Sequence, residues 1–169
     1  MTDQGTVELE TRSGFWFRVR PTRDADEAKL AAFFRALGPE DLRFRFLSTI
    51  REVSHDRLVE MIEHKPETDS VVAESKAGEI VAAAILAGDP ATRRGEVAIS
   101  IRADHKGKGI GWSLLEHLVE TARQRGYASI ESLEDRQNRS AIALEQEMGF
   151  IAEPLDDDPT LVRVSRQLT

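Results

Sequence analysis

The chain contains no cysteine among its 169 residues. Without thiols it can form no disulfide bond, bind no metal through thiolate ligands and use no cysteine nucleophile. Its four histidines, His55, His64, His105 and His117, do not show the spacing of a zinc-binding motif such as H-E-x-x-H. We therefore expect a protein without a metal that works in the reducing cytoplasm.

Long apolar segments are also missing. The longest one, Ile80 to Ala87, is far shorter than the roughly 20 residues that a membrane-spanning helix needs. The N-terminus has no apolar core typical of a signal peptide. The formal net charge of −7 disfavours a protein that binds nucleic acid by neutralising phosphates. We expect neither a membrane nor a nucleic acid as a partner.

The length and composition are those of a globular protein with one domain. A chain of 169 residues can bury a single sizeable core. The first residues are polar, so we expect a flexible N-terminus over 1–14 and a single domain over 15–169.

Hydrophobic periodicity predicts alternating helices and strands. The predicted helices are 22–37, 39–46, 54–64, 110–125 and 138–148, and the predicted strands are 15–20, 70–75, 80–87, 95–103, 127–133 and 161–168, with a further strand beginning at Phe150. The helix at 110–125 is long enough to connect two parallel strands. This order predicts an α/β (α+β) fold, with a mixed, mostly antiparallel central sheet and helices on both faces.

A glycine-rich turn lies between the strand at 95–103 and the helix at 110–125. Gly107, Gly109 and Gly111 alternate there with Lys106, Lys108 and Ile110. Glycines allow close approach of a ligand to the main chain, and the start of a helix offers free N–H groups and a positive dipole end. The turn therefore suits a diphosphate, although the same glycines also suit a tight turn without a ligand. It matches neither a nucleotide P-loop nor the dinucleotide fingerprint.

A second block sharpens this interpretation. The segment from Glu96 to Ile110, followed by Asn138 to Phe150, resembles the GCN5-related N-acetyltransferase (GNAT) family. In that family a Q/R-x-x-G-x-G/A turn holds the diphosphate of coenzyme A, and lysine stands here at the Gln or Arg position. The resemblance implies acetyl-CoA as cosubstrate, bound by Ile99, Ser100, Ile101, Lys106, Gly107, Lys108, Gly109, Ile110, Gly111, Asn138 and Ser140. Asn138 also suits the N-cap of the last helix.

A closer likeness concerns the catalytic residues. Leu37 to Leu47, together with the entry to the turn, is similar to bacterial Pat-type protein lysine acetyltransferases, which use a glutamate at the position of Glu96 as general base. Spacing alone favours an exposed glutamate beside two arginines; the resemblance favours the base. The resemblance also implies that the main chain of Ile99 to Ile101 polarises the thioester carbonyl. Many members carry a tyrosine as general acid where this chain has Glu145, so Ser140 or water is left for that role.

The sequence thus predicts direct transfer of acetyl from acetyl-CoA to a primary amine. The acceptor is left open among a protein lysine and small amines, and a homodimer is also left open. Two alternatives from other classes remain: an acyl-CoA-binding regulatory module with little or no catalysis, and a phosphate-binding interaction domain unrelated to coenzyme A.

Overall fold

The computed structural model describes residues 5–168, which form one eight-stranded sheet and five α-helices. The strands are β1 (Val7–Glu10), β2 (Trp16–Pro21), β3 (Thr68–Glu74), β4 (Ile80–Asp89), β5 (Arg94–Ile101), β6 (Ser129–Asp135), β7 (Ile151–Pro154) and β8 (Leu161–Gln167). The helices are α1 (Glu27–Arg35), α2 (Pro39–Phe46), α3 (His55–Ile62), α4 (Ile110–Gln124) and α5 (Arg139–Glu147), with short 3-10 turns at Asp24–Asp26 and Ala103–His105.

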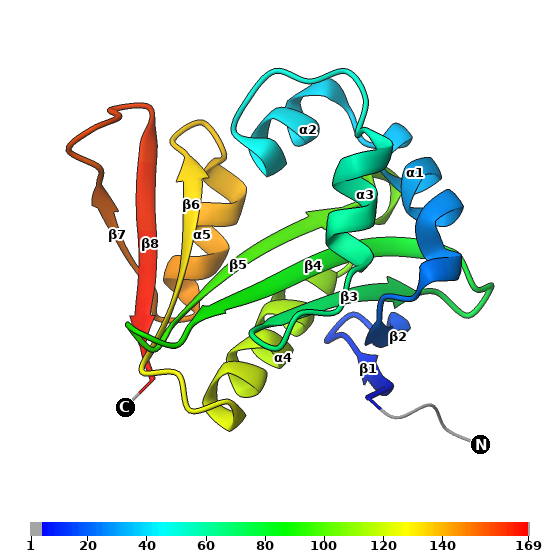
Figure 1. Cartoon of the computed structure of the whole chain (residues 1–169), viewed down its shortest axis with the longest axis horizontal. Helices are drawn as coiled ribbons and strands as arrows, with labels where there is room; N and C mark the ends of the chain where they lie inside the picture. The colour runs from blue at the N-terminus through cyan, green and yellow to red at the C-terminus, as the bar shows by residue number, and fades with distance from the viewer. Residues whose placement is uncertain (1–4, 169) are drawn as a thin grey trace.

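The strands follow the order β1-β2-β3-β4-β5-β6-β8-β7 across the sheet (Figure 1). All neighbours are antiparallel except β5 and β6, which are parallel and are joined through α4. The predicted mixed, mostly antiparallel sheet is therefore confirmed.

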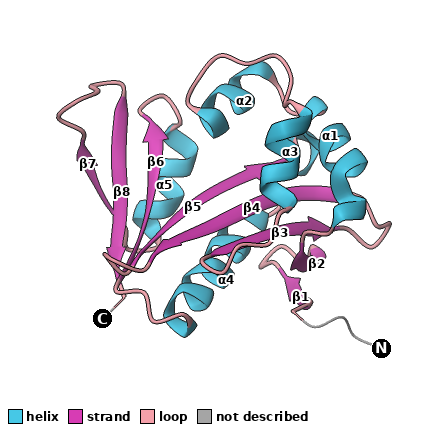
Figure 2. Ribbon diagram, in the orientation of Figure 1, coloured by secondary structure: helices cyan, strands magenta, loops and turns pink. Residues whose placement is uncertain are grey.

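Helices cover both faces of this sheet (Figure 2). Because side chains alternate along a strand, Val72 packs with α1, α2 and α3 on one face, while Ala73 packs with α4 on the other. The apolar stripe predicted for the helix at 110–125 forms the centre of the second core, with Leu114 fully buried. The prediction of helices on both faces is confirmed.

The N-terminal segment differs from its prediction. We expected residues 1–14 to be loose, yet β1 pairs with β2, with Leu9 opposite Phe17. Leu9 packs against the main core, which gives this short polar strand an apolar contact. Residues 1–4 lie outside the described part of the chain.

A buried ion cluster ties α1 to the sheet. The Arg20 guanidinium donates to Asp26 at 2.7 Å through Nη2 and to Glu74 at 2.5 Å through Nε. All three residues are buried. Buried charges are tolerated when they are paired and fully hydrogen-bonded, so this cluster fixes the chain entering α1 against β2 and β3.

Strands β5 and β6 separate shortly after they meet. Their parallel pairing covers only Arg94–Glu96 and Ser129–Glu131, and beyond it β6 continues along β8 instead (Figure 1). Pairing with β4 engages only the main-chain groups on one edge of β5. The other edge, from Val97 onward, therefore faces the opening between the two strands.

Candidate active site

A cavity of about 430 Å³ occupies the opening between β5 and β6, and is lined also by α2, the glycine-rich turn, α4 and α5. The predicted cofactor-binding residues that line it are Ile99, Ser100, Ile101, Lys106, Gly107, Gly109, Ile110, Gly111, Asn138 and Ser140. The fold thus brings the two sequence blocks of the predicted site into one space.

The glycine-rich turn has the backbone that only glycine adopts readily. Gly107 and Gly109 have φ of 78° and 89°. A Cβ at Gly109 would lie 3.1 Å from the Cβ of Thr11. The first helical hydrogen bond of α4 runs from the N–H of Ser113 to the carbonyl of Gly109, so the N–H groups before it have no acceptor within the helix. The turn therefore presents main-chain donors at the cavity.

The two lysines of the turn differ in position. Lys106 lines the cavity, and its Nζ lies 2.6 Å from Oδ1 of Asp41 on α2. Lys108 does not line the cavity: its Nζ lies 5.5 Å from the ring centre of Phe15, and its carbonyl accepts a hydrogen bond from Ser13. The structure therefore brings one of the two predicted lysine contacts to the site.

The exposed edge of β5 forms one wall of the cavity. Ile99, Ser100 and Ile101 all line it. The Ser100 hydroxyl is buried and has no hydrogen-bond partner among the described residues. A free buried hydroxyl and unpaired strand groups suit an extended ligand that carries amides.

Helix α2 closes the side of the cavity opposite α5. It contributes Asp41, Phe44 and Arg45, and Arg43 holds it to the end of β6 through an ion pair with Asp135 at 2.7 Å. Burial lowers the pKa of Arg45, and the positive charge of Arg57 lowers it further, while the nearby carboxylate of Glu96 opposes both.

Glu96 lies where β5 and β6 separate. It is part of the last parallel pair, opposite Glu131, and its side chain is exposed. The exposed position that spacing alone favours for this glutamate is confirmed. Glu96 lies beside the cavity near Arg45 and does not line it.

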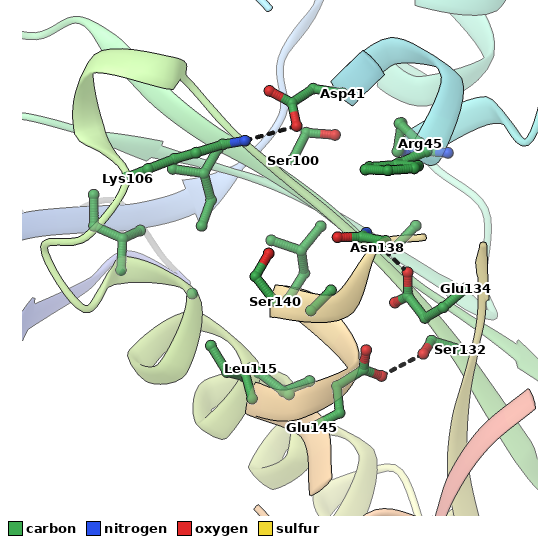
Figure 3. Close-up of a pocket in the computed structure, with 18 of the residues that line it drawn as sticks. Asp41, Arg45, Ser100, Lys106, Leu115, Ser132, Glu134, Asn138, Ser140 and Glu145 are labelled. Carbon is green, nitrogen blue, oxygen red and sulfur yellow. Dashed lines mark hydrogen bonds and ion pairs between the residues drawn. The ribbon is translucent and has the colours of Figure 1, made fainter. Parts of the chain in front are cut away.

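A group of polar side chains lies at the other end of the cavity (Figure 3). Ser132 on β6 donates a hydrogen bond to the carboxyl of Glu145 on α5, and Asn138 donates one to Glu134 at 3.3 Å. Asn138 has the N-cap position of α5, but its side chain makes no capping bond there. Its amide instead connects the start of α5 to β6.

Sequence reasoning missed several residues of this cavity, namely Asp41, Phe44, Arg45, Ser132, Glu134 and, as a cavity-lining group, Glu145. One signal was available for Glu145. It follows Ala141 by four positions and precedes Met148 by three, so it lies on the apolar face of its helix. A charged side chain on an apolar helix face becomes buried on folding, which indicates a functional role. The positions of Asp41 and Glu134 carry no such signal.

Comparison with known proteins identifies the family. The model of the Acetyltransferase (GNAT) family matches residues 31–150. Acetyltransferase PA5475 of Pseudomonas aeruginosa is 30% identical over 149 residues, which cover 85% of this chain and 80% of that protein. The chain therefore belongs to the GNAT acetyltransferase family. It is an acetyl-CoA-dependent N-acetyltransferase.

Solved structures share the fold. The GNAT domain of S. lividans PAT superposes with a TM-score of 0.89 at 22% identity, covering 99% of both chains. Spermidine N-acetyltransferase from Vibrio cholerae, solved with CoA and spermine, superposes with a TM-score of 0.76 at 18% identity, covering 89% of this chain and 95% of that one.

None of the helices in residues 5–168 has the length and apolar character needed to cross a membrane. In the same residues, no group of three or more His, Asp and Glu side chains is placed to hold a metal ion.

Proposed function

We propose that this enzyme transfers the acetyl group directly from acetyl-CoA to a primary amine, with Glu96 as general base. The primary amine that we propose is the side chain of a protein lysine. The observation that carries this proposal is the junction of β5 and β6. The exposed edge of β5 and the glycine-rich turn line the cavity on one side of this junction, and Glu96 lies where the two strands separate.

The turn and the exposed edge of β5 would hold the cosubstrate. Main-chain N–H groups at Gly109 to Gly111 and the ammonium of Lys106 suit the diphosphate. Each charge-assisted hydrogen bond contributes about 1.5–3 kcal/mol, so three or four of them supply much of the roughly 8 kcal/mol of micromolar binding. The main chain of Ile99 to Ile101 would hold the pantetheine arm and polarise the thioester carbonyl, while Asn138 and Ser140 would lie on its other side.

The chemical step requires a neutral amine. An alkylammonium has a pKa of about 10.4, so a base must remove its proton before the nitrogen can attack the thioester carbon. Glu96 is exposed beside the cavity, where it can take that proton directly or through a water. The 169 residues contain no cysteine to form an acyl-enzyme thioester, which favours direct transfer in a ternary complex.

The acceptor would enter on the side of α2, past Arg45. Glu96 interacts electrostatically with Arg45 at this entrance, and its negative charge would also attract an ammonium. The similarity of Leu37 to Leu47 to Pat-type protein lysine acetyltransferases favours a lysine side chain as acceptor. Spermidine N-acetyltransferase from Vibrio cholerae shares the fold, which makes a polyamine the second candidate.

The test measures release of CoA thiol from acetyl-CoA with lysine peptides, spermidine and free amino acids. We expect the highest kcat/KM on lysine peptides. Glu96→Gln should lower kcat/KM by about 10²–10⁴-fold at neutral pH while the Kd of CoA stays unchanged. The loss should shrink at high pH, where the amine loses its proton without help.

Glu153→Gln is the matched control, because Glu153 is an exposed glutamate on the edge strand β7. It should leave turnover unchanged. Wild-type kcat/KM in Glu96→Gln would refute the role of Glu96 as base. A higher kcat/KM on spermidine than on any lysine peptide would refute the acceptor class.

A further inference from the structure

Glu145 is a buried acid on the wall of the cavity. It is only 4% exposed, and it lines the cavity together with Ser132 and Glu134. Ser132 donates to its Oε2, whereas its Oε1 is buried without a hydrogen-bond partner among the described residues. A carboxylate would leave an unsatisfied charged oxygen there, which is costly, while a carboxylic acid carries a proton on it.

The groups facing Glu145 add no positive charge. Strand β6 contributes Ser132 and Glu134, α4 contributes Leu115, and α5 itself places Asn138 at its start (Figure 3). In this view Lys106 and Arg45 lie at the opposite end of the cavity. The nearest charged neighbour is thus a second carboxyl group.

Both carboxyls are shifted in the direction of the neutral form. Burial raises the pKa of Glu145, and the adjacent Glu134 raises it further, to about 9, while the bond from Ser132 opposes the rise. Burial also raises the pKa of Glu134, and the polar groups of Glu145, Ser132 and Asn138 beside it oppose that rise. Two carboxyls that share one site retain a proton between them, and Glu145 is its main holder at neutral pH.

We propose that Glu145, kept as a neutral carboxylic acid beside Glu134, donates a proton to the thiolate of CoA as it leaves. This inference rests on the proposed acetyl transfer and supplies the general acid that the reaction lacks. The departing sulfur would lie along the exposed edge of β5, in the same cavity that Glu145 lines.

The proton and electron balance is complete. The amine nitrogen loses the proton of its ammonium form before it bonds to the acetyl carbon and a second proton afterwards, and both pass in turn through Glu96 to solvent. The carbon–sulfur bond breaks with its electron pair on sulfur, and the sulfur takes the proton of Glu145. Glu145 is left as a carboxylate beside Glu134, and its high proton affinity lets it recover a proton from solvent before the next turnover.

Glu145→Gln is the first test, because glutamine keeps the shape and the partner for Ser132 but carries no transferable proton. We expect kcat to fall by about 10²–10⁴-fold, with the Kd of CoA and the KM of the amine within about twofold of wild type. Glu145→Tyr should recover part of kcat if the variant folds, because a phenol with a pKa of about 10 is also a neutral O–H donor.

Glu134→Gln tests Glu145 through the pH dependence of kcat, which would not shift if Glu145 had only a structural role. Without the second carboxyl, Glu145 loses its proton at lower pH, so the alkaline limb of the kcat profile should shift to lower pH. Infrared difference spectra of isotope-labelled wild type and Glu145→Gln should show a carboxylic acid C=O band at neutral pH only in wild type.

The outcomes separate the two proposals. If wild type transfers acetyl to amines and Glu145→Gln keeps its kcat, or the limb does not move in Glu134→Gln, this inference fails and the proposed function stands. If wild type releases no thiol with any amine, the proposed function fails together with it. If Glu145→Gln does not fold, the Glu134→Gln profile and the infrared band of wild type decide the inference.

Discussion

Lys106 on the glycine-rich turn lies 2.6 Å from Asp41 on α2, measured from Nζ to Oδ1. The two residues are 65 positions apart, and their contact joins the turn to the helix on the other side of the cavity. Lys106, the cation expected to bind a diphosphate, is therefore already paired with a carboxylate in this structure. Binding of an anion at the turn must compete with Asp41 for Lys106.

Removing this competition should strengthen binding of CoA. Asp41→Asn frees Lys106 and removes a negative charge, so the Kd of CoA should fall by roughly fivefold, about 1 kcal/mol. The gain should shrink at high salt because the pair is partly exposed. Calorimetric titration at two salt concentrations measures both effects. Asp56 is an exposed aspartate on α3, so Asp56→Asn should change neither the Kd of CoA nor its salt dependence. A higher Kd of CoA in Asp41→Asn would contradict the prediction.

Gly109→Ala should damage both stability and binding. Gly109 has φ of 89°, and its new Cβ would lie 3.1 Å from Thr11, so the free energy of unfolding should fall by about 2–3 kcal/mol. The Kd of CoA should rise at least tenfold, because the turn must move. Urea denaturation and CoA titration measure the two quantities.

Gly78→Ala is the matched control for that substitution. Gly78 has φ of 81° in the turn between β3 and β4, and a Cβ there meets nothing within 4 Å. It should cost about 1–2 kcal/mol of stability and leave the Kd of CoA unchanged. Equal effects of both substitutions on CoA binding would mean that the turn at Gly109 is not a ligand site.

Arg20→Met should be the most destabilising single change outside the active site. It leaves Asp26 and Glu74 buried without their shared cation, at a cost of about 3–5 kcal/mol. Burial raises the pKa of Asp26, but hydrogen bonds from Arg20 and from the Arg23 N–H outweigh it and lower the pKa below its ordinary value. A group with a lowered pKa stabilises the fold above its unfolded pKa and loses that contribution as pH falls.

Wild type should therefore lose stability on acidification below about pH 4, and Arg20→Met should lose less over the same range. Chemical denaturation at a series of pH values measures this. Parallel curves for the two proteins would contradict the assignment of the acid-sensitive contribution to the Arg20 cluster.

Glu145 should make stability depend on pH in the opposite direction. Its pKa is raised in the fold, so its stabilising contribution is fully present below the unfolded pKa of about 4.5 and is lost as pH rises toward about 9. Across that range wild type should lose up to about 1.4 kcal/mol per pH unit relative to Glu145→Gln. Denaturation of both proteins between pH 5 and pH 9, roughly the interval bounded by the two pKa values, measures the difference. A difference that does not change with pH would show that Glu145 is ionised in the fold.

Local features of the chain were predictable because they depend on neighbouring residues. The helix predicted at 39–46 matches α2 at both ends, where Pro39 occupies the first turn. Gly107 and Gly109 adopt the left-handed backbone expected of the turn. Periodicity also identified the core face of α4, and the spacing of the two blocks indicated the family.

Contacts between distant elements were not predictable in this way. The turning of Lys108 toward Phe15 depends on segments that meet only after the sheet has formed. No residue pattern near Asp41 indicates its contact with Lys106.

The sequence by itself determined most of the elements, their order and the glycine-rich turn proposed to bind an anion, since hydrophobic period and turn chemistry are local properties. Only the tertiary structure decided how that site is completed. The separation of β5 from β6 opens the cavity, and the packing of α5 against β6 places Glu145 beside Glu134. Burial and the proximity of like charges set the proton affinity of this pair, and both arise from packing between elements rather than from the order of residues within them.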